Sequence, residues 1–247
     1  MPANRFLLVL ISFSSLAAQT SIELEGQYWF TQLHATIRVE KNGIGTDIDA
    51  RKDLGMTDSN FPVGRASVSW GHHTLSFEYT PIDFSGDQIV SRTLTFNGNT
   101  YTVGTRVISG LEIQDLQLGW SYGFRLAGGH VRLGPLTEVH GFLLSGHLRA
   151  PEFNIDSREN LDVGLPTVGP TLIISPHPKL DIYGEAAGMW AGDYGYFVRS
   201  EAGVRVRPVR HIQFTAGYRT FNLRITNSSD FANPHLRGAF VGAGFHW

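Results

Sequence analysis

Apolar and polar residues alternate with a period of two along much of the chain. In residues 196–206, Tyr196, Val198 and Val204 share one face with small residues, while Arg199 and Glu201 lie on the other. The same two-faced pattern recurs in residues 65–70, 75–80, 115–122 and 180–190. A period of two is typical of β-strands, whereas a helix would mix the two sets of residues. The pattern therefore predicts a succession of strands, each with one apolar and one polar face.

Breaks in the pattern differ in length, and the two kinds alternate along the chain. Short breaks with the Gly and Pro of tight turns occur at residues 71–73, 124–129, 175–179 and 208–211. Longer polar segments lie at roughly residues 41–60, 83–109, 147–162, 191–195 and 226–235. Short turns at one end and long loops at the other are typical of outer-membrane barrels, and this spacing gives about ten strands.

The first residues have the order of a secretory signal peptide. Arg5 precedes an apolar run at residues 6–11, and the small residues Ala17 and Ala18 follow. We expect residues 1–18 to be a signal peptide and residues 19–247 to form one barrel domain. The apolar run is broken by Ser12, and no later stretch reaches the roughly 20 apolar residues that a membrane helix needs. A closed β-barrel is the remaining structure with which this chain could span a membrane.

Tryptophan positions agree with a membrane barrel. Trp70, Trp120 and Trp247 stand at the short-turn ends of their strands, and Trp190 stands at a long-loop end. Membrane barrels carry aromatic girdles at both interfaces, whereas a soluble sandwich would hold most aromatic residues in mid-strand. The sequence thus predicts an all-β fold, a transmembrane antiparallel up-and-down β-barrel of about ten strands, with eight strands as the alternative.

The last strand resembles a known assembly signal. Gly242, Phe245 and Trp247 end an alternating strand in the order Gly, aromatic, terminal aromatic, which is similar to the C-terminal signal of Gram-negative outer-membrane proteins, although Phe240 replaces the usual polar residue. Residues 45–49 and 53–55 also resemble a segment of small, uncharacterised outer-membrane barrels. The resemblance implies a bacterial outer-membrane location, contact with outer-membrane lipid and lipopolysaccharide, and assembly by the barrel assembly machinery.

Composition narrows the function. The chain has 20 Lys and Arg against 22 Asp and Glu, a formal net charge of -2, so it lacks the cationic excess of nucleic-acid binders. It has no Cys, which excludes disulfides, thiolate metal sites and Cys nucleophiles. No Gly-rich phosphate loop or zinc motif is present, and we expect neither a cofactor nor a metal.

If the apolar faces meet lipid, the polar faces place a balanced set of charges in the lumen. In so narrow a space unpaired charges are costly, so opposite signs are expected to pair and close the lumen. A narrow selective channel is the alternative. Strand one adds Glu23 and Glu25 to a predicted lumen network of Arg65, Glu78, Asp115, Arg132, Glu138, Asp181, Glu185, Arg199, Glu201, Arg205, Arg207 and Arg219.

Enzymatic readings lack a complete set of residues. Asp47 and Asp49 have the spacing of the paired Asp of omptin-type outer-membrane proteases, but no Asp-x-His follows. Lipid A deacylases use a His-x-Ser pair, which is absent, and His140 and Ser145 fall on opposite faces of one strand. We therefore expect no catalytic residues, and a structural or surface-recognition role through the long loops, with a narrow channel or a surface hydrolase as alternatives. No ligand is indicated.

One long loop has a pattern of its own. Residues 91–107 are rich in Thr around Asn97-Gly98, and Asn-Gly between β-formers is a strong hairpin signal. We expect a hairpin that projects from the barrel for recognition, or else a rigid extension that covers the barrel mouth.

Overall fold

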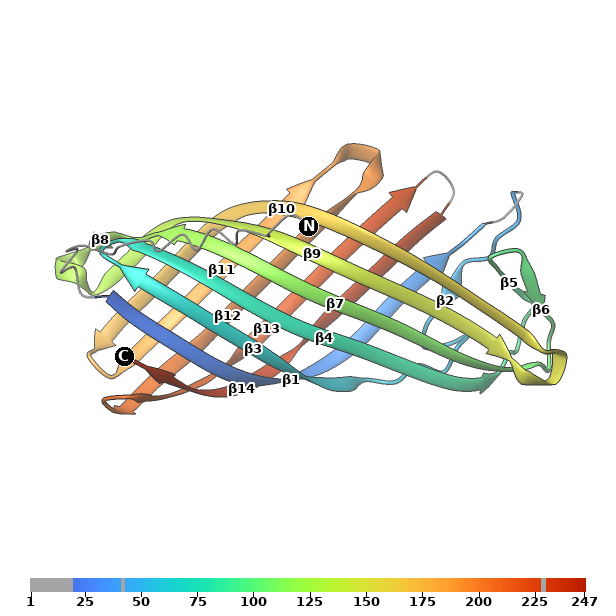
Figure 1. The fold of residues 1–247 in the computed structure, drawn as a ribbon, viewed down its shortest axis with the longest axis horizontal. Coiled ribbons are helices and arrows are strands. Elements are labelled where there is room, and N and C mark those ends of the chain that lie inside the picture. Colours follow the sequence, from blue (N-terminus) through green and yellow to red (C-terminus); the bar gives the residue numbers. More distant parts are fainter. Residues whose placement is uncertain (1–19, 41–42, 228–229) are drawn as a thin grey trace, which may run out of the picture.

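Ten long strands form one closed antiparallel barrel in the computed structural model (Figure 1). The structure describes residues 20–40, 43–227 and 230–247, so the expected signal peptide lies outside it. The barrel strands are β1 (Thr20–Arg38), β3 (Ser59–Trp70), β4 (His73–Ile89), β7 (Arg106–Tyr122), β9 (Val131–Ala150), β10 (Ile155–His177), β11 (Leu180–Trp190), β12 (Gly195–Val209), β13 (Ile212–Asn227) and β14 (Asp230–His246). Short strands β2 (Ile48–Asp49), β5 (Leu94–Phe96), β6 (Asn99–Tyr101) and β8 (Phe124–Leu126) complete the set.

Each barrel strand pairs with its neighbour in the sequence, and the first pairs with the last. The β1–β14 register runs from Glu23 opposite His246 to Arg38 opposite Phe231, and this pairing closes the barrel. The prediction of an all-β, up-and-down antiparallel barrel of ten strands is confirmed, and the eight-strand alternative is wrong. In the described ranges no helix is long and apolar enough to cross a bilayer.

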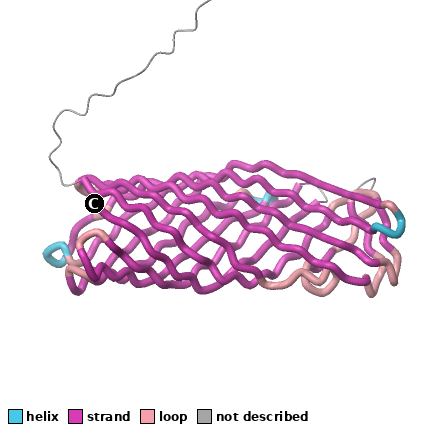
Figure 2. The backbone as a smooth tube through the Cα atoms, turned by 60° about the horizontal axis from the view of Figure 1, so that its bottom comes forward, coloured by secondary structure: helices cyan, strands magenta, loops and turns pink. Residues whose placement is uncertain are grey.

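The two ends of the barrel differ. One end, called here the turn end, carries the connections 71–72, 123–130, 178–179 and 210–211, together with Thr20 and Trp247. The opposite end, called the loop end, carries the connections that follow β1, β4, β9, β11 and β13. Figure 2 shows the larger share of loop backbone at the end remote from the C-terminus. The two longest connections between barrel strands, residues 39–58 and 90–105, both lie at the loop end, whereas the connections after β9 and β11 are as short as the turns at the other end.

The strands are longer than the sequence pattern indicates. β1, β9 and β10 have 19, 20 and 23 residues, about twice the 9 to 11 that cross a bilayer. The expected long loop at residues 147–162 is wrong, because β9 and β10 continue through most of it and leave only a turn at residues 151–154. The expected loops at 83–109 and 226–235 are likewise partly strand.

This difference has a physical reason, which β1 shows well. Near the turn end its exposed side chains are apolar, such as Leu24 and Phe30, and its inward side chains are polar, such as Glu25. Nearer the loop end the inward side chains are apolar, such as Leu33, and exposed His34 faces outward. A strand in water needs polar residues outside, so its alternation is the reverse of that of a strand in lipid.

The outer surface near the turn end carries a continuous set of exposed apolar side chains, the apolar belt. Exposed apolar atoms on this scale exceed what a soluble monomer usually presents, and they match the lipid-facing band of a membrane barrel. The belt consists of Ile22, Leu24, Tyr28, Phe30, Leu75, Phe77, Leu116, Leu118, Trp120, Leu133, Val139, Leu143, Val168, Leu172, Ile174, Ile182, Val198, Val204, Val206, Phe214, Tyr218, Val241 and Phe245.

The Asn97-Gly98 segment forms the turn of hairpin β5–β6. Both residues have positive φ, 46° and 75°, as a two-residue type I′ turn requires. Leu94, Phe96 and Tyr101 are buried, and the Tyr101 hydroxyl donates to the Leu148 carbonyl of β9 at 3.1 Å. The hairpin therefore folds over the barrel mouth as a cover, which is the second of the two arrangements expected from its sequence.

Candidate functional site

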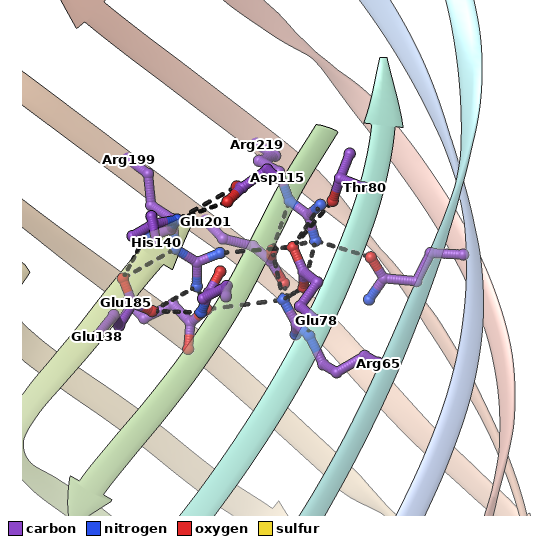
Figure 3. A network of polar contacts seen from close by, with 12 residues as sticks. Arg65, Glu78, Thr80, Asp115, Glu138, His140, Glu185, Arg199, Glu201 and Arg219 are labelled. Atoms are coloured by element: carbon purple, nitrogen blue, oxygen red, sulfur yellow. Dashed lines mark hydrogen bonds and ion pairs between the residues drawn. The ribbon is translucent and has the colours of Figure 1, made fainter. Parts of the chain in front are cut away.

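The centre of the lumen holds a layer of charged side chains, called here the charged layer (Figure 3). Arg65 of β3 donates through Nε to Glu78 Oε2 at 2.7 Å, and through its two Nη atoms to both carboxylate oxygens of Glu201 at 3.1 and 3.0 Å. Glu201 also accepts from Arg219 Nε at 2.8 Å and from the Tyr183 hydroxyl at 2.8 Å. Three donors thus converge on one carboxylate, which is the arrangement that keeps a buried charge tolerable.

Arg199 organises the other half of the charged layer. It contacts Glu185, and its Nη2 lies 3.0 Å from Glu138 Oε1 on β9. Glu138 further accepts from Gln117 Nε2 at 2.7 Å and from the Thr167 hydroxyl at 3.3 Å. The layer therefore connects β7, β9 and β10 with β12, which β11 separates from β10 in the wall.

His140 lies between two carboxylates of this layer. Its Nδ1 is 2.9 Å from Asp115 Oδ1, and its Nε2 is 3.3 Å from Glu138 Oε2. An imidazolium satisfies both contacts, because both of its ring nitrogens donate. Its ring also stacks on Phe142 with centroids 5.3 Å apart, so it joins the charged layer to the apolar side chains above it.

A second group of charges lies nearer the turn end. Arg207 Nη1 is 2.7 Å from Asp181 Oδ2, and Arg207 and Arg205 lie 3.3 and 3.5 Å from the Glu23 carboxylate. The side chain of Arg132 makes no ion pair or hydrogen bond with any described residue. Glu23, Arg132, Arg205 and Arg207, together with several Ser and Thr, line a cavity of about 330 Å³. This part of the lumen is polar and has room for water.

Facing residues of β9, β12 and β13 form an aromatic layer, which lies next to the charged layer on the side of the loop end. Phe142, Phe197 and Phe221 meet edge to face, with ring centroids 5.0 to 5.6 Å apart. All three are buried, as are Trp29 and Phe240 on the neighbouring strands. Edge-to-face contacts are a favourable arrangement of aromatic rings. The lumen is thus occupied by two different layers, one charged and one aromatic.

The twelve residues that the sequence places in the lumen lie on inward faces of their strands. All of them except Arg132 contact an oppositely charged group or, for Asp115, His140. Sequence reasoning did not include Gln27, Gln117, His140 or Gln213, which are buried in the same layers. Gln117 and His140 each stand two residues after a predicted lumen acid, so the period of two could have found them.

Residues of the proposed terminal signal lie at the turn end. Phe245 and Trp247 are exposed on the outer surface, and their rings stack with centroids 6.1 Å apart. Gly242 faces the lumen, where a Cβ atom would come within 2.8 Å of Glu25 Oε1. Glycine at this position therefore leaves the room that the Glu25 carboxylate occupies.

The acidic residues of the first long loop have structural partners. Asp47 contacts Arg38, and Asp49 Oδ1 accepts from the backbone of Arg51 and Lys52 at 3.0 and 2.9 Å. No described histidine hydrogen-bonds Asp47 or Asp49. His140 and Ser145 occupy opposite faces of β9, as the sequence predicts. Among the described residues no group of three or more His, Asp or Glu side chains is placed to hold a metal ion.

Asp53 fastens the same loop to the next one. Its carboxylate accepts from Arg92 Nε at 2.9 Å and Nη2 at 2.5 Å, and from the Asp49 backbone at 2.8 Å. Burial alone would raise the pKa of Asp53, but the hydrogen bonds from Arg92 and the Asp49 backbone outweigh it, and the pKa lies below 3.8. The ion pair therefore favours the closed arrangement of both loops at neutral pH.

No protein-family model matches the chain, and no curated protein matches it. Among solved structures, the outer membrane protease OmpT from Escherichia coli superposes with a TM-score of 0.59 at 8% identity, covering 96% of this chain and 99% of that chain. The chain has the fold of a Gram-negative outer-membrane β-barrel. Ail, the attachment invasion locus protein of Yersinia pestis, was also found, with a TM-score of 0.41 and 10% identity over 92% of this chain and 99% of that chain. The translocator domain of the autotransporter NalP from Neisseria meningitidis has a TM-score of 0.43 and 11% identity over 91% of this chain and 88% of that chain.

Proposed function

We propose that the protein resides in the outer membrane with its apolar belt in the bilayer, its turn end in the periplasm and its loop end outside the cell. The belt supports this placement, because so many exposed apolar side chains are stable only against lipid. The two longest connections between barrel strands, which follow β1 and β4, support the orientation, since outer-membrane barrels keep their longer loops outside the cell. The parts of the strands that extend past the apolar belt toward the loop end then form a stalk, which carries the loops away from the membrane.

Lipopolysaccharide is the partner that we propose for the stalk surface next to the belt. Arg224 of β13 and Arg237 of β14 are exposed there, and Arg237 lies opposite Gln32, two residues beyond the belt residue Phe30. Guanidinium groups bind phosphate oxygens with paired hydrogen bonds. The two arginines would meet phosphate groups at the level of the lipid headgroups. The barrel assembly machinery, which recognises a C-terminal strand such as β14, would insert the protein into the membrane.

We propose that the barrel is closed and acts as a structural or surface-recognition protein, not as a pore. The contact between Arg65 and Glu201 carries this proposal. These residues belong to β3 and β12, which are separated by three strands around the wall, so their two hydrogen bonds cross the lumen. The aromatic layer adds a second obstruction, and an apolar constriction excludes ions by shedding water.

Recognition would fall to the loop end. Ile44, Val103, Phe153 and Tyr194 are exposed there on connections between strands, at 57% to 76% of their full accessibility. Rigid scaffolds commonly carry binding residues on such loops. The cover formed by hairpin β5–β6 is hydrogen-bonded to Thr46 of the first long loop and to Ser157 and Glu159 of β10, and holding these neighbouring segments in place reduces the ordering cost of binding a partner. Neither the sequence nor the described side chains indicate a catalytic set, so the proposal contains no enzymatic step.

Ion conductance tests the closed barrel. Purified protein is reconstituted in planar bilayers, and insertion is verified on vesicles of the same lipid by the shift between unboiled and boiled gel samples. We expect no steady current from the wild type. We also expect none from Phe142→Ala, because the charged layer remains in place. Steady ion current through the wild-type protein would overturn the closed barrel and favour the narrow channel.

A further inference from the structure

Strand β10 continues beyond the hairpin that β11 and β12 form. Pairing between β10 and β11 begins at Val168 opposite Gly188 and runs toward the turn end. Residues 155–167 of β10 pair with β9 on one edge, and within the described ranges no strand pairs with their other edge. The barrel wall is therefore lower between β10 and β13 than elsewhere, and Figure 1 shows β10 running on past the β11–β12 hairpin. We call this low part of the wall the notch.

Apolar side chains line the notch. Val163 and Leu165 of β10, Met189 of β11, Tyr194 of the connecting turn and Ile225 of β13 surround a groove of about 190 Å³. Further along β10, Leu161 lies on the inward face but remains 38% exposed. Inward leucines elsewhere in the barrel, such as Leu33 and Leu236, are buried, so the exposure of Leu161 is unusual. The notch is thus an open apolar groove in the wall of the stalk.

The groove continues into an apolar cavity beneath the loops. The cavity has a volume of about 160 Å³ and shares Ile225 with the groove, while Leu54, Phe96, Leu111 and Leu144 form other parts of its wall. Gly146 of β9 also lines it, and a Cβ atom at this position would meet no atom within 4 Å. Apolar cavities of about 150 Å³ stay dry and take up small hydrocarbons.

The lower end of the groove meets the apolar belt. Val168, Gly188 and Val198 lie in one row across β10, β11 and β12, next to the notch on the side of the turn end. Val168 and Val198 are exposed belt residues, and Trp190 beside them is 79% exposed. An exposed tryptophan at the edge of such a belt is typical of the interface between lipid and water. The groove therefore runs from the expected surface of the bilayer into the interior of the stalk.

Polar groups at the rim of the cavity are already paired. Arg38 contacts Asp47 and Glu40, Asp230 accepts from the backbone of Glu40 at 2.6 Å, and Glu159 accepts from Asn97 at 3.1 Å. In the described lining of the cavity, the one cationic side chain, Arg38, is therefore already paired, while Arg224 lines the groove outside the cavity. A ligand with its charge inside the cavity would therefore leave that charge unpaired, whereas a ligand with its polar group outside would not.

We propose that the groove and cavity bind one acyl chain of a membrane lipid, whose headgroup stays at the edge of the belt beside Trp190. The continuity of the groove with the belt favours a lipid of the bilayer over a fatty acid from the medium. This inference rests on the proposed membrane location and adds a binding site to it. The acyl chain removes apolar surface of Leu161 and Leu144 from water, and that burial drives the binding.

Photo-crosslinking tests the site with the full-length mature protein in vesicles of phosphatidylethanolamine and phosphatidylglycerol, one of whose acyl chains carries a diazirine. After irradiation, digestion and mass spectrometry, we expect cross-links to belt residues such as Val139 and to the inward residues Leu144 and Leu161. Gly146→Leu fills the cavity, so the cross-links to Leu144 should be lost while those to Val139 remain. Gly164→Leu is the matched control, because it adds the same side chain to the outer face of the neighbouring strand β10, where a Cβ atom would meet no atom within 4 Å, and it should keep both cross-links.

The belt cross-links separate the two proposals. Labelling of Val139 without labelling of Leu144 or Leu161 in the wild type would overturn the acyl-chain site and leave the membrane location intact. Loss of all cross-links, Val139 included, would overturn the membrane location and the acyl-chain site together. Labelling of Leu144 by a diazirine fatty acid added to the aqueous phase, but not by the phospholipid, would overturn the assignment to a membrane lipid.

Discussion

The guanidinium carbon of Arg219 lies 5.5 Å from the centre of the Trp29 indole ring, at the level where the charged layer of the lumen meets the aromatic layer. The same guanidinium lies 5.3 Å from the centre of the Phe240 ring. Its nitrogens meanwhile contact Glu201, Glu78 and Gln27. A planar guanidinium can stack on aromatic rings with its faces while its edge donates hydrogen bonds. Arg219 therefore joins the two layers.

Replacing Arg219 should destabilise the barrel more than the loss of one surface charge. In Arg219→Ala the buried carboxylates of Glu201 and Glu78 lose a partner, which costs about 3 to 5 kcal/mol for a buried pair. Arg219→Lys should recover only part of that, because an ammonium cannot make the planar contacts. Arg224→Ala on the same strand is the control, since Arg224 is exposed on the outer surface. Urea unfolding in lipid vesicles measures the three variants, and equal midpoints for Arg219→Ala and Arg224→Ala would contradict the central role of Arg219.

Much of the fold could be predicted from the sequence, because alternation along each strand distinguishes the side chains of the outer face from those of the lumen face. In β12 the alternation of Tyr196 to Val206 with Phe197, Arg199 and Glu201 assigns every side chain to the correct face. The reversal further along the strands could not be read in the same way. Polar residues such as Asp83 and Asp87 on the outer face of β4 look like a loop unless the buried Phe84 between them is taken as an inward residue.

The membership of the lumen site could be predicted, but its pairing could not. The period of two places Arg65 and Glu201 on polar faces, yet they are 136 residues apart and lie on opposite sides of the barrel. Which charge meets which depends on strand number and on the tilt of the strands, which local alternation does not encode. The groove was missed for a related reason, since it depends on the different heights of β10 and the β11–β12 hairpin.

Assembly should depend on position in the chain and not on exposed apolar area. Phe245 and Trp247 are 54% and 55% exposed, whereas Trp190 is 79% exposed. Replacing Phe245 and Trp247 together by Ser should block insertion of the newly made protein, because this pair forms the proposed terminal signal of β14. Trp190→Ser should insert at nearly the wild-type yield. The heat-modifiable band in outer-membrane fractions measures the yield, and similar yields for the two variants would show that the C-terminal resemblance is accidental.

The ion pair of Asp53 with Arg92 should make the first long loop sensitive to acid. The pKa of Asp53 in the folded protein lies below 3.8, and its unfolded value is about 3.9. The stabilisation is therefore fully present above the unfolded pKa and is lost as the pH falls through the lower folded pKa. The chain has no Cys, so a single Cys in place of the exposed Lys52 can carry a spin label.

Spectra of that label should show an ordered loop at neutral pH and a more mobile one once the pH falls through the folded pKa of Asp53. Asp53→Asn should be mobile at every pH. The exposed pair of Asp87 with Arg106 lies on the barrel wall and supplies the control, because Asp87→Asn should leave the label unchanged. A wild-type spectrum that does not change between pH 7 and acid, or an Asp53→Asn spectrum equal to it, would show that other contacts hold the loop.

The orientation of the barrel can be tested at the tip of hairpin β5–β6. Gly98 is exposed at this tip, while the hairpin behind it is held by buried Phe96 and Tyr101, so a short epitope inserted after Gly98 should leave the cover in place. An antibody should label intact cells that carry this insertion. Gly128 lies in a turn at the other end, where a Cβ atom would meet no atom within 4 Å, and the same epitope inserted after it should be labelled only once the outer membrane is permeabilised. Short turns belong to the periplasm and long loops to the outside in barrels of this kind. The reverse labelling pattern would place the loop end in the periplasm, and the recognition role of the loops would have to be assigned to a periplasmic partner.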